Sequence, residues 1–289
     1  MGYLSFVTLL WAFSFSLIGV YLAGQVDSDF SVLTRVILGG LLFLPLTHWR
    51  GLGKELRWGM VLIGMLQFGV TYLCLYRSFD YLTVPEVLLF TITTPLYVTL
   101  LDDALYRRFS PGALVAAGLA VLGAGIIRYD GVSSDYVIGF SLLQLANFSF
   151  AAGQVGYKHL TNRHPTSVPR RGFFGYFYLG ALIIAAPSFL LFGDPDMMPS
   201  TATQWGVLLW LGFAASGAGL YLWNRGACMV DAGTLAVMNN ALVPAGLLVN
   251  LLIWNREADL FRLALGGAVI AFSLWVNASL RPSDSPSLA

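Results

Sequence analysis

The chain of 289 residues is 57% hydrophobic and 11% charged, and its mean hydropathy is +0.73. This composition excludes an ordinary water-soluble domain and predicts an integral membrane protein that has the lipid bilayer as a partner. The balance of 16 basic and 15 acidic side chains argues against a nucleic-acid partner, because nucleic acid is bound by a concentrated basic surface.

Ten apolar segments have about the length that crosses a bilayer, for which roughly 20 residues span about 30 Å of hydrocarbon. In chain order they are residues 3–23, 31–47, 56–79, 86–101, 111–127, 137–157, 173–192, 205–227, 235–254 and 260–280. They lack the alternation of polar and apolar residues that the strands of a transmembrane barrel require. We therefore predict an all-α membrane protein of ten transmembrane helices. Its longest loop is predicted at 158–171, and a disordered tail at 282–289.

Lys and Arg residues are unevenly distributed between the predicted loops. With the N-terminus inside, ten of them lie on the cytoplasmic side and only Arg128, Arg256 and Arg262 lie outside. The loops at 24–30 and 193–204 contain acids and no Lys or Arg. Since short loops rich in Lys and Arg stay in the cytoplasm, we expect both termini to be cytoplasmic.

The second half of the sequence resembles the first at a constant offset of 149 residues, which places Pro244 on Pro95. The same offset aligns Tyr72 with Tyr221, Leu73 with Leu222, Arg107 with Arg256, Leu114 with Leu263 and Gly118 with Gly267. An offset of 135 aligns Phe13-Ser14-Phe15 with Phe148-Ser149-Phe150. Chance similarity among apolar helices is the alternative. The repeat predicts two five-helix units, 1–132 and 133–281, and because five is odd the second unit is inverted in the membrane.

Inverted repeats let a cavity open alternately to the two sides of a membrane, so a transporter is the leading function. The chain carries Leu10-Trp11-Ala12, Arg35, mid-helix Pro95 and Pro244, and glycine-rich fifth and tenth predicted helices. In these features it resembles the drug/metabolite transporter superfamily, in particular its EamA-type bacterial members with ten helices. One departure is that Asp102-Asp103 followed by Arg107-Arg108 replaces the acid that such proteins often carry after the fourth helix, whereas Glu257 is its counterpart in the second half.

The resemblance implies a multi-pass protein of the bacterial cytoplasmic membrane. It also implies export or exchange of small metabolites, with amino acids prominent among them. The substrate would pass through a central cavity lined by helices one to four and six to nine.

Polar side chains recur at helical spacing on several predicted spans, as Gln67, Thr71, Cys74 and Ser78 do on the third. Such faces are expected to point away from lipid, towards a cavity or towards hydrogen bonds with neighbouring helices. Aromatic rings add surface on which a substrate can stack. The predicted substrate-binding residues are Trp11, Arg35, Gln67, Tyr72, Glu86, Phe90, Thr94, Tyr97, Asn147, Tyr221, Asn239 and Asn240. Pro95 and Pro244 are predicted hinges, with a static kink as the alternative.

Charges within a span are costly unless they are paired, hydrated or functional. Arg35 lies inside its predicted helix, and Glu86 is the one acid that we place in a span. We expect these two residues either to pair or to bracket a zwitterionic substrate. Arg77 and Arg225 lie near helix ends and are expected to snorkel to the interface.

The sequence predicts neither a cofactor nor a metal site, and it contains no HExxH motif. His48, His159 and His164 fall in predicted loops, so the intramembrane acid–base pair of an enzyme is not expected. Because no histidine or paired-acid relay lies in a span, exchange or uniport is as well supported as proton antiport.

We therefore predict a secondary transporter of small neutral or zwitterionic metabolites, with amino-acid export or exchange as the leading function. A multidrug or organic-cation exporter of the same fold is one alternative. A membrane scaffold or receptor without transport is another, which the short loops disfavour. Small residues on the fifth predicted helix favour packing within one half over a homodimer, and they are Gly112, Ala116, Ala120 and Ala124.

Overall fold

The computed structural model describes residues 2–105, 134–230 and 232–254, with isolated positions at 119 and between 261 and 279. Within these residues every regular element is a helix. In this part of the chain, seven helical segments are long and apolar enough to cross a membrane. The first four are α1 (Gly2–Tyr21), α2 (Ser28–Phe43) with η1 (Leu44–Leu46), α3 (Lys54–Gly64) with η2 (Met65–Val70) and α4 (Thr71–Ser78), and α5 (Val84–Phe90) with η3 (Thr91–Thr93) and α6 (Thr94–Leu105). The other three are α8 (Ser134–Arg163), η4 (Arg170–Gly172) with α9 (Gly175–Phe192), and α10 (Ala202–Trp210) with η6 (Leu211–Gly219) and α11 (Leu220–Ala227). An eighth joins α12 (Ala232–Val249) to η7 (Asn250–Trp254), and the short turn η5 (Pro195–Met197) lies between α9 and α10.

Each of these eight segments falls on a predicted span, which confirms the all-helical fold for the described part of the chain. The spans predicted at 111–127 and 260–280, the small-residue ridge and the tail at 282–289 lie outside the described residues. The total of ten helices and the division into units 1–132 and 133–281 therefore remain predictions.

One helix is longer than predicted, because α8 ends at Arg163 and not at residue 157. Polar contacts hold its last turns: Lys158 Nζ donates to the carbonyl oxygen of Val230 at 2.9 Å, and Thr161 Oγ1 donates to that of Tyr157 at 2.9 Å. The 30 residues of α8 span about 45 Å, more than the roughly 30 Å of hydrocarbon. Part of the loop predicted at 158–171 is thus helix that extends beyond the apolar layer.

Several helices depart from α geometry in their interiors. Wide π turns form η2, η6 and η7, and the tight turn η3 precedes Pro95. Proline lacks the N–H that would bond the carbonyl four residues earlier, and that carbonyl, on Thr91, instead accepts from Thr94 Oγ1 at 2.8 Å. The chain is irregular at Pro95, whereas α12 continues as α-helix through Pro244.

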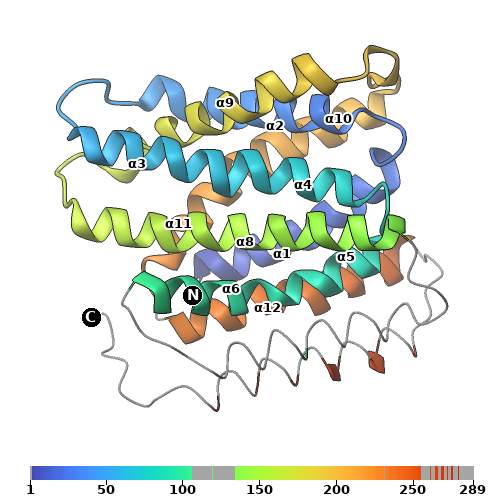
Figure 1. The fold of residues 1–289 in the computed structure, drawn as a ribbon. Coiled ribbons are helices and arrows are strands. Elements are labelled where there is room, and N and C mark those ends of the chain that lie inside the picture. The colour runs from blue at the N-terminus through green and yellow to red at the C-terminus, as the bar shows by residue number, and fades with distance from the viewer. Residues whose placement is uncertain are drawn as a thin grey trace.

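The helices lie side by side with their axes roughly aligned (Figure 1). α2 packs against α9 and η6, α3 against α9 and α8, and α4 against α8. On the other side of the bundle, α1 packs against α12 and α11, and α6 packs against α8. Segments from both halves of the sequence therefore alternate around the interior, which is where a site can be shared between them.

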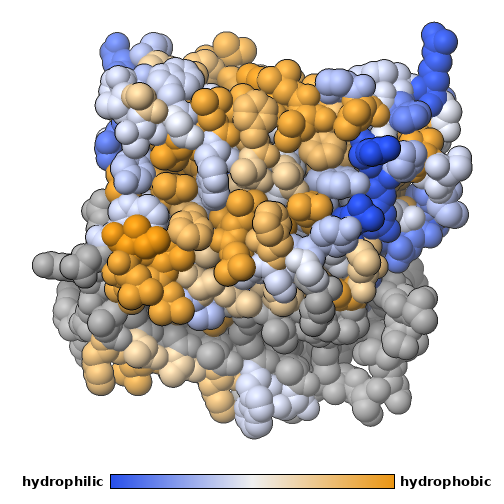
Figure 2. Space-filling model, turned by 180° about the vertical axis from the view of Figure 1, so that it is seen from behind, coloured by the Kyte–Doolittle hydropathy of each residue, from blue (hydrophilic) through white to orange (hydrophobic). Residues whose placement is uncertain are grey.

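The surface carries an apolar band between more hydrophilic ends (Figure 2). Large apolar side chains are among the most exposed groups of the described residues, with Leu190 81% and Leu252 79% exposed. Such exposure is unfavourable in water and favourable against lipid. The long axes of the helices therefore lie across the membrane.

Candidate functional site

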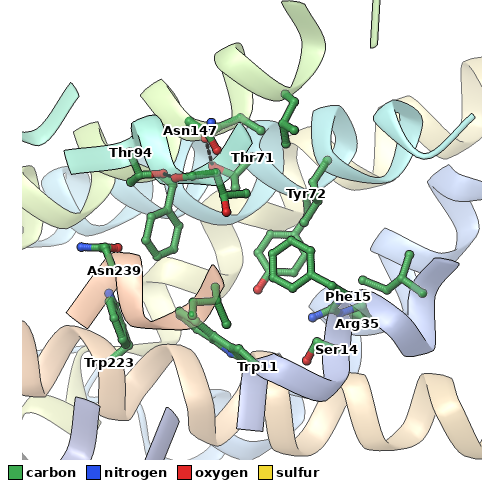
Figure 3. A pocket seen from close by; sticks show the side chains of 17 residues that line it. Trp11, Ser14, Phe15, Arg35, Thr71, Tyr72, Thr94, Asn147, Trp223 and Asn239 are labelled. Carbon is green, nitrogen blue, oxygen red and sulfur yellow. Dashed lines mark hydrogen bonds between the residues drawn. The ribbon is translucent and has the colours of Figure 1, made fainter. Parts of the chain in front are cut away.

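A cavity lies where α1, α2, α4, α6, α8, α11 and α12 face one another (Figure 3). Most of its 17 lining residues are apolar or aromatic, with hydroxyl and amide groups between them. Among the described residues that form this lining, Arg35 is the one that carries a charge. An apolar pocket with few, well-placed polar groups is typical of a small-molecule site.

Six of the predicted substrate-binding residues line this cavity: Trp11, Arg35, Tyr72, Thr94, Asn147 and Asn239. Each comes from a different helix, so packing of the whole bundle brings them together. Figure 3 shows Arg35 and Tyr72 on one side of the cavity and Thr94 and Asn239 on the opposite side. The cavity therefore has a cationic side and an amide and hydroxyl side, with aromatic rings between them.

The guanidinium of Arg35 is held in a fixed position by three neighbouring groups. Its Nε donates to Ser216 Oγ at 2.8 Å and its Nη1 donates to the hydroxyl of Tyr76 at 3.0 Å. Its Cζ lies 4.4 Å from the centre of the Tyr72 ring, close enough for a cation–π interaction. Because Ser216 lies in η6, this arginine links α2 to both α4 and the π turn of the second half.

Two tryptophans form an aromatic wall on α1 and α11. Their rings lie 4.9 Å apart between centroids. The indole N–H of Trp11 donates to the carbonyl of Ala215 at 2.9 Å, and that of Trp223 donates to Gln154 Oε1 at 2.9 Å. With both N–H groups satisfied inside the protein, each ring is fixed in orientation and offers its apolar surface to the cavity.

Asn147 presents an acceptor to the cavity. Its Nδ2 donates at 3.0 Å to the carbonyl of Phe90 and at 3.0 Å to Thr93 Oγ1. These bonds use both amide hydrogens and leave the side-chain carbonyl oxygen for a ligand. Asn239 Nδ2 bonds to the carbonyl of Leu235 in its own helix at 3.0 Å, so its oxygen is likewise not consumed by that bond.

Two predicted cavity residues are used elsewhere in the structure. Gln67 is fully buried and forms a reciprocal pair with Asn224, in which each side-chain amide donates to the other at 3.1 Å. Glu86 closes a capping box at the start of α5, where its Oε2 accepts from the backbone N–H of Thr83 at 2.8 Å. The expected pairing of Arg35 with Glu86 is therefore wrong.

Three aromatic residues predicted for the cavity lie behind its wall or apart from it. They pack against other rings: Phe90 against Tyr136 and Phe140, Tyr97 against Phe148, and Tyr221 against Phe43 and Phe174. The hydroxyl of Tyr97 also donates to Gln144 Oε1 at 3.1 Å. The side chain of the last predicted residue, Asn240, lies outside the described residues.

Arg77 forms an ion pair that the sequence did not reveal. Its Nη2 lies 2.9 Å from Asp29 Oδ1, and Ser188 also donates to that carboxylate. Arg77 lies in the last turn of α4 with its side chain 38% exposed, and the start of α2 brings a carboxylate within its reach. Arg225, in contrast, is exposed and lies over the ring of Tyr3.

Several cavity residues were absent from the predicted set, among them Trp223, Ser14, Phe15 and Phe150. The sequence did contain a signal for Phe15 and Phe150, because the offset of 135 residues aligns them. Among the described residues, no three His, Cys, Asp or Glu side chains gather as a metal site. The chemistry of the cavity is therefore that of hydrogen bonds, one cation and aromatic surface.

Known proteins resemble the chain over nearly its whole length. A protein of Pseudomonas aeruginosa named "Probable biotin transporter" is 64% identical over 277 residues, which are 96% of this chain and 97% of that protein. Proteins of Salmonella typhimurium and Escherichia coli named "Biotin transporter" are each 49% identical over 278 residues, which are 96% of this chain and 92% of those proteins. One solved structure, 19% identical, covers 97% of both chains with a TM-score of 0.68 and shows a shared fold.

The sequence model described as EamA-like transporter family matches residues 1–129. The high identity of the relatives extends the relationship across the second half of the chain. The chain therefore belongs to the EamA-like transporters of the drug/metabolite transporter superfamily, and it is a membrane transporter and not an enzyme.

Proposed function

We propose that the protein transports biotin across the bacterial cytoplasmic membrane. The observation that carries this proposal is the 64% identity, over 96% of the chain, to a protein named for biotin. The amino-acid substrate was expected from the family resemblance, and biotin replaces it because the relatives are named for biotin. The separate idea that Arg35 and Glu86 bracket a zwitterion loses its support, because no carboxylate is among the described residues of the cavity lining and Glu86 caps α5.

The cavity suits the chemistry of biotin. Biotin combines a carboxylate, an aliphatic chain, a thioether ring and a ureido group with N–H donors and a carbonyl acceptor. The rings of Trp11, Trp223 and Phe150 offer apolar surface to the chain and the thioether, and Asn147 and Asn239 offer amide groups to the ureido ring. We propose that Arg35, Tyr72 and Thr94, the other predicted residues that line the cavity, also contact the substrate.

For the mechanism we propose alternating access by two inverted repeats. The offset of 149 residues carries α4 (Thr71–Ser78) onto α11 (Leu220–Ala227), and it carries the π turn η2 into η6. The corresponding segments therefore share an unusual helix geometry as well as a few identical residues. Pro95 and Pro244 are the proposed hinges, with the irregular turn η3 next to Pro95 as the supporting feature.

Counterflow of radiolabelled biotin into proteoliposomes that hold the purified protein tests the proposal. We expect uptake only when the vesicles contain both the protein and unlabelled biotin, with protein-free vesicles as the control. Leucine, phenylalanine and methionine are tested in parallel. Counterflow of an amino acid without counterflow of biotin would overturn the proposal, and repeating the assay with an imposed pH gradient shows whether protons are coupled.

A further inference from the structure

We infer that Arg35 binds the carboxylate of the substrate and makes the transporter select free biotin over its neutral esters and amides. This inference rests on the proposed function and assigns one end of the substrate to one side of the cavity. It also orients biotin, with the carboxylate towards α2 and the ureido ring towards the amides of α8 and α12.

The first argument is that Arg35 is a cation without a counter-ion. The side chain is 1% exposed, and among the described residues no carboxylate lies within ion-pair distance of it. A buried charge in a membrane protein is costly unless something compensates it. In contrast, Arg77 has its acid, Asp29, at 2.9 Å. The charge of Arg35 faces the cavity, so an anionic ligand there supplies the missing partner.

The second argument is that Arg35 retains donors for that ligand. A guanidinium has five N–H groups in a fixed fork. The bonds to Ser216 and Tyr76 use the N–H of Nε and one N–H of Nη1. The hydroxyl of Tyr72 also lies within hydrogen-bonding reach of the guanidinium, so two of the five N–H groups have no bond to the described residues. The guanidinium carbon also lies over the rings of Tyr72 and Tyr76, at 4.4 and 5.6 Å from their centres. The remaining N–H groups are thus positioned in advance for the oxygens of a carboxylate, which favours strong, charge-assisted bonds.

The third argument is the distribution of polar groups in the cavity. Figure 3 shows Arg35 with Ser14 and Tyr72 on one side and Asn239 with Thr94 on the other. Trp11 lies between the two sides (Figure 3), and the ring of Phe150 packs against it at 5.9 Å between centroids. Biotin has the same order of groups, with a carboxylate at one end, an apolar middle and a ureido ring at the other end.

A purely structural role is the competing explanation, because Arg35 also connects α2 to Tyr76 of α4 and Ser216 of η6. A structural arginine would affect every substrate equally. A carboxylate-binding arginine distinguishes charged from neutral ligands, so the decisive readout is selectivity and not the total rate.

The first experiment uses the unmodified protein in the biotin counterflow assay, with biotin, biotinamide and biotin methyl ester as competitors. We expect both neutral compounds to compete at least about tenfold more weakly than biotin, because a charge-assisted bond is lost. Equal competition by all three would overturn the role of Arg35 and leave biotin transport intact. If the unmodified protein does not move biotin, the proposed function fails, and this inference fails with it.

The second experiment compares Arg35→Gln with Arg225→Gln, a matched change at an exposed arginine outside the cavity lining. We expect Arg35→Gln to reduce the preference for biotin over biotinamide to within about threefold, and Arg35→Lys to keep part of it. We expect Arg225→Gln to keep the full preference. An Arg35→Gln protein that retains the preference overturns the inference. If that variant does not fold, the competition by neutral compounds in the unmodified protein still decides.

Discussion

At the scale of single residues, the cavity side chains are oriented by bonds to the protein that leave specific groups for a ligand. Asn147 donates both amide hydrogens to groups of α5 and η3, and its side-chain oxygen remains available to a ligand. Trp11 and Trp223 donate their indole N–H groups to the protein, and their ring faces remain available. Side chains fixed in this way lose little conformational entropy when a substrate binds.

Replacing Asn147 by alanine removes the amide that we place against the ureido ring. We expect the half-saturation concentration for biotin to rise about five- to tenfold, the size of one hydrogen bond. Concentration-dependent counterflow measures it. The control is Asn162→Ala, the same change at an exposed position of the same helix. Unchanged transport by Asn147→Ala at equal protein content would contradict the assignment.

At the scale of helices, α3 and α9 approach so closely that their contact requires glycine. A Cβ on Gly64 would lie 1.8 Å from the carbonyl oxygen of Phe177, and one on Gly180 would lie 1.9 Å from that of Val61. Small residues at such crossings allow backbone contact between membrane helices. The close packing of α3 against α9 is therefore possible only because Gly64 and Gly180 have no Cβ atom.

The change Gly180→Ala tests this contact. We expect it to destabilise the protein by about 1–3 kcal/mol, because the helices must move apart. Gly206→Ala is the control, since a Cβ there has no atom within 4 Å, and alanine in a helix is expected to stabilise by about 0.5–1 kcal/mol. Thermal unfolding in detergent, followed by tryptophan fluorescence, measures both. Equal melting temperatures for the two variants would show that the contact is not tight.

The amide pair of Gln67 and Asn224 joins the π turn η2 to α11. Changing Gln67 to leucine leaves the Asn224 oxygen without its partner, so we expect a loss of about 1–3 kcal/mol. The double variant Gln67→Leu with Asn224→Leu is expected to lose less than the sum of the two single changes. Chemical or thermal unfolding of the four proteins gives the coupling energy. Additive losses would mean that the two amides do not stabilise each other.

At the scale of the whole molecule, the apolar band of Figure 2 and the uneven Lys and Arg content of the loops determine how the protein lies in the membrane. The loop between α2 and α3 contains Arg50, and the loop between α9 and α10 contains Asp196 without Lys or Arg. Because basic loops are retained in the cytoplasm, we expect these two loops on opposite sides of the membrane.

Single cysteines test this orientation in a background in which Cys74 and Cys228, both free thiols, are replaced by serine. We expect a membrane-impermeant maleimide to label Asp196→Cys in intact cells. Arg50→Cys should react only after the membrane is permeabilised. The reverse pattern would place both termini outside the cytoplasm.

Hydropathy and the periodicity of polar residues are local properties, so the sequence by itself determined much of this protein. It located the eight helical segments of the described part, and it selected six cavity residues on six helices. The type of side chain was sufficient to select these six residues, because polar groups in membrane-spanning helices mostly face the interior of the protein. The resemblance carried by Trp11, Arg35, Pro95 and Pro244 indicated the transporter family, which the relatives then showed.

Only the tertiary structure decided which inward-facing groups meet the cavity and which meet each other. Gln67 lies in a π turn, which changes the angle between it and Thr71 from that of a regular helix, and it faces Asn224. Trp223 reaches the cavity through the packing of α11 beside α1. Glu86 is different, because its partner Thr83 lies three residues earlier in a Thr-x-x-Glu capping box, a local pattern that the sequence contains. The partners of Gln67 and Trp223 are distant in sequence, and their contact depends on helix packing that no local pattern records.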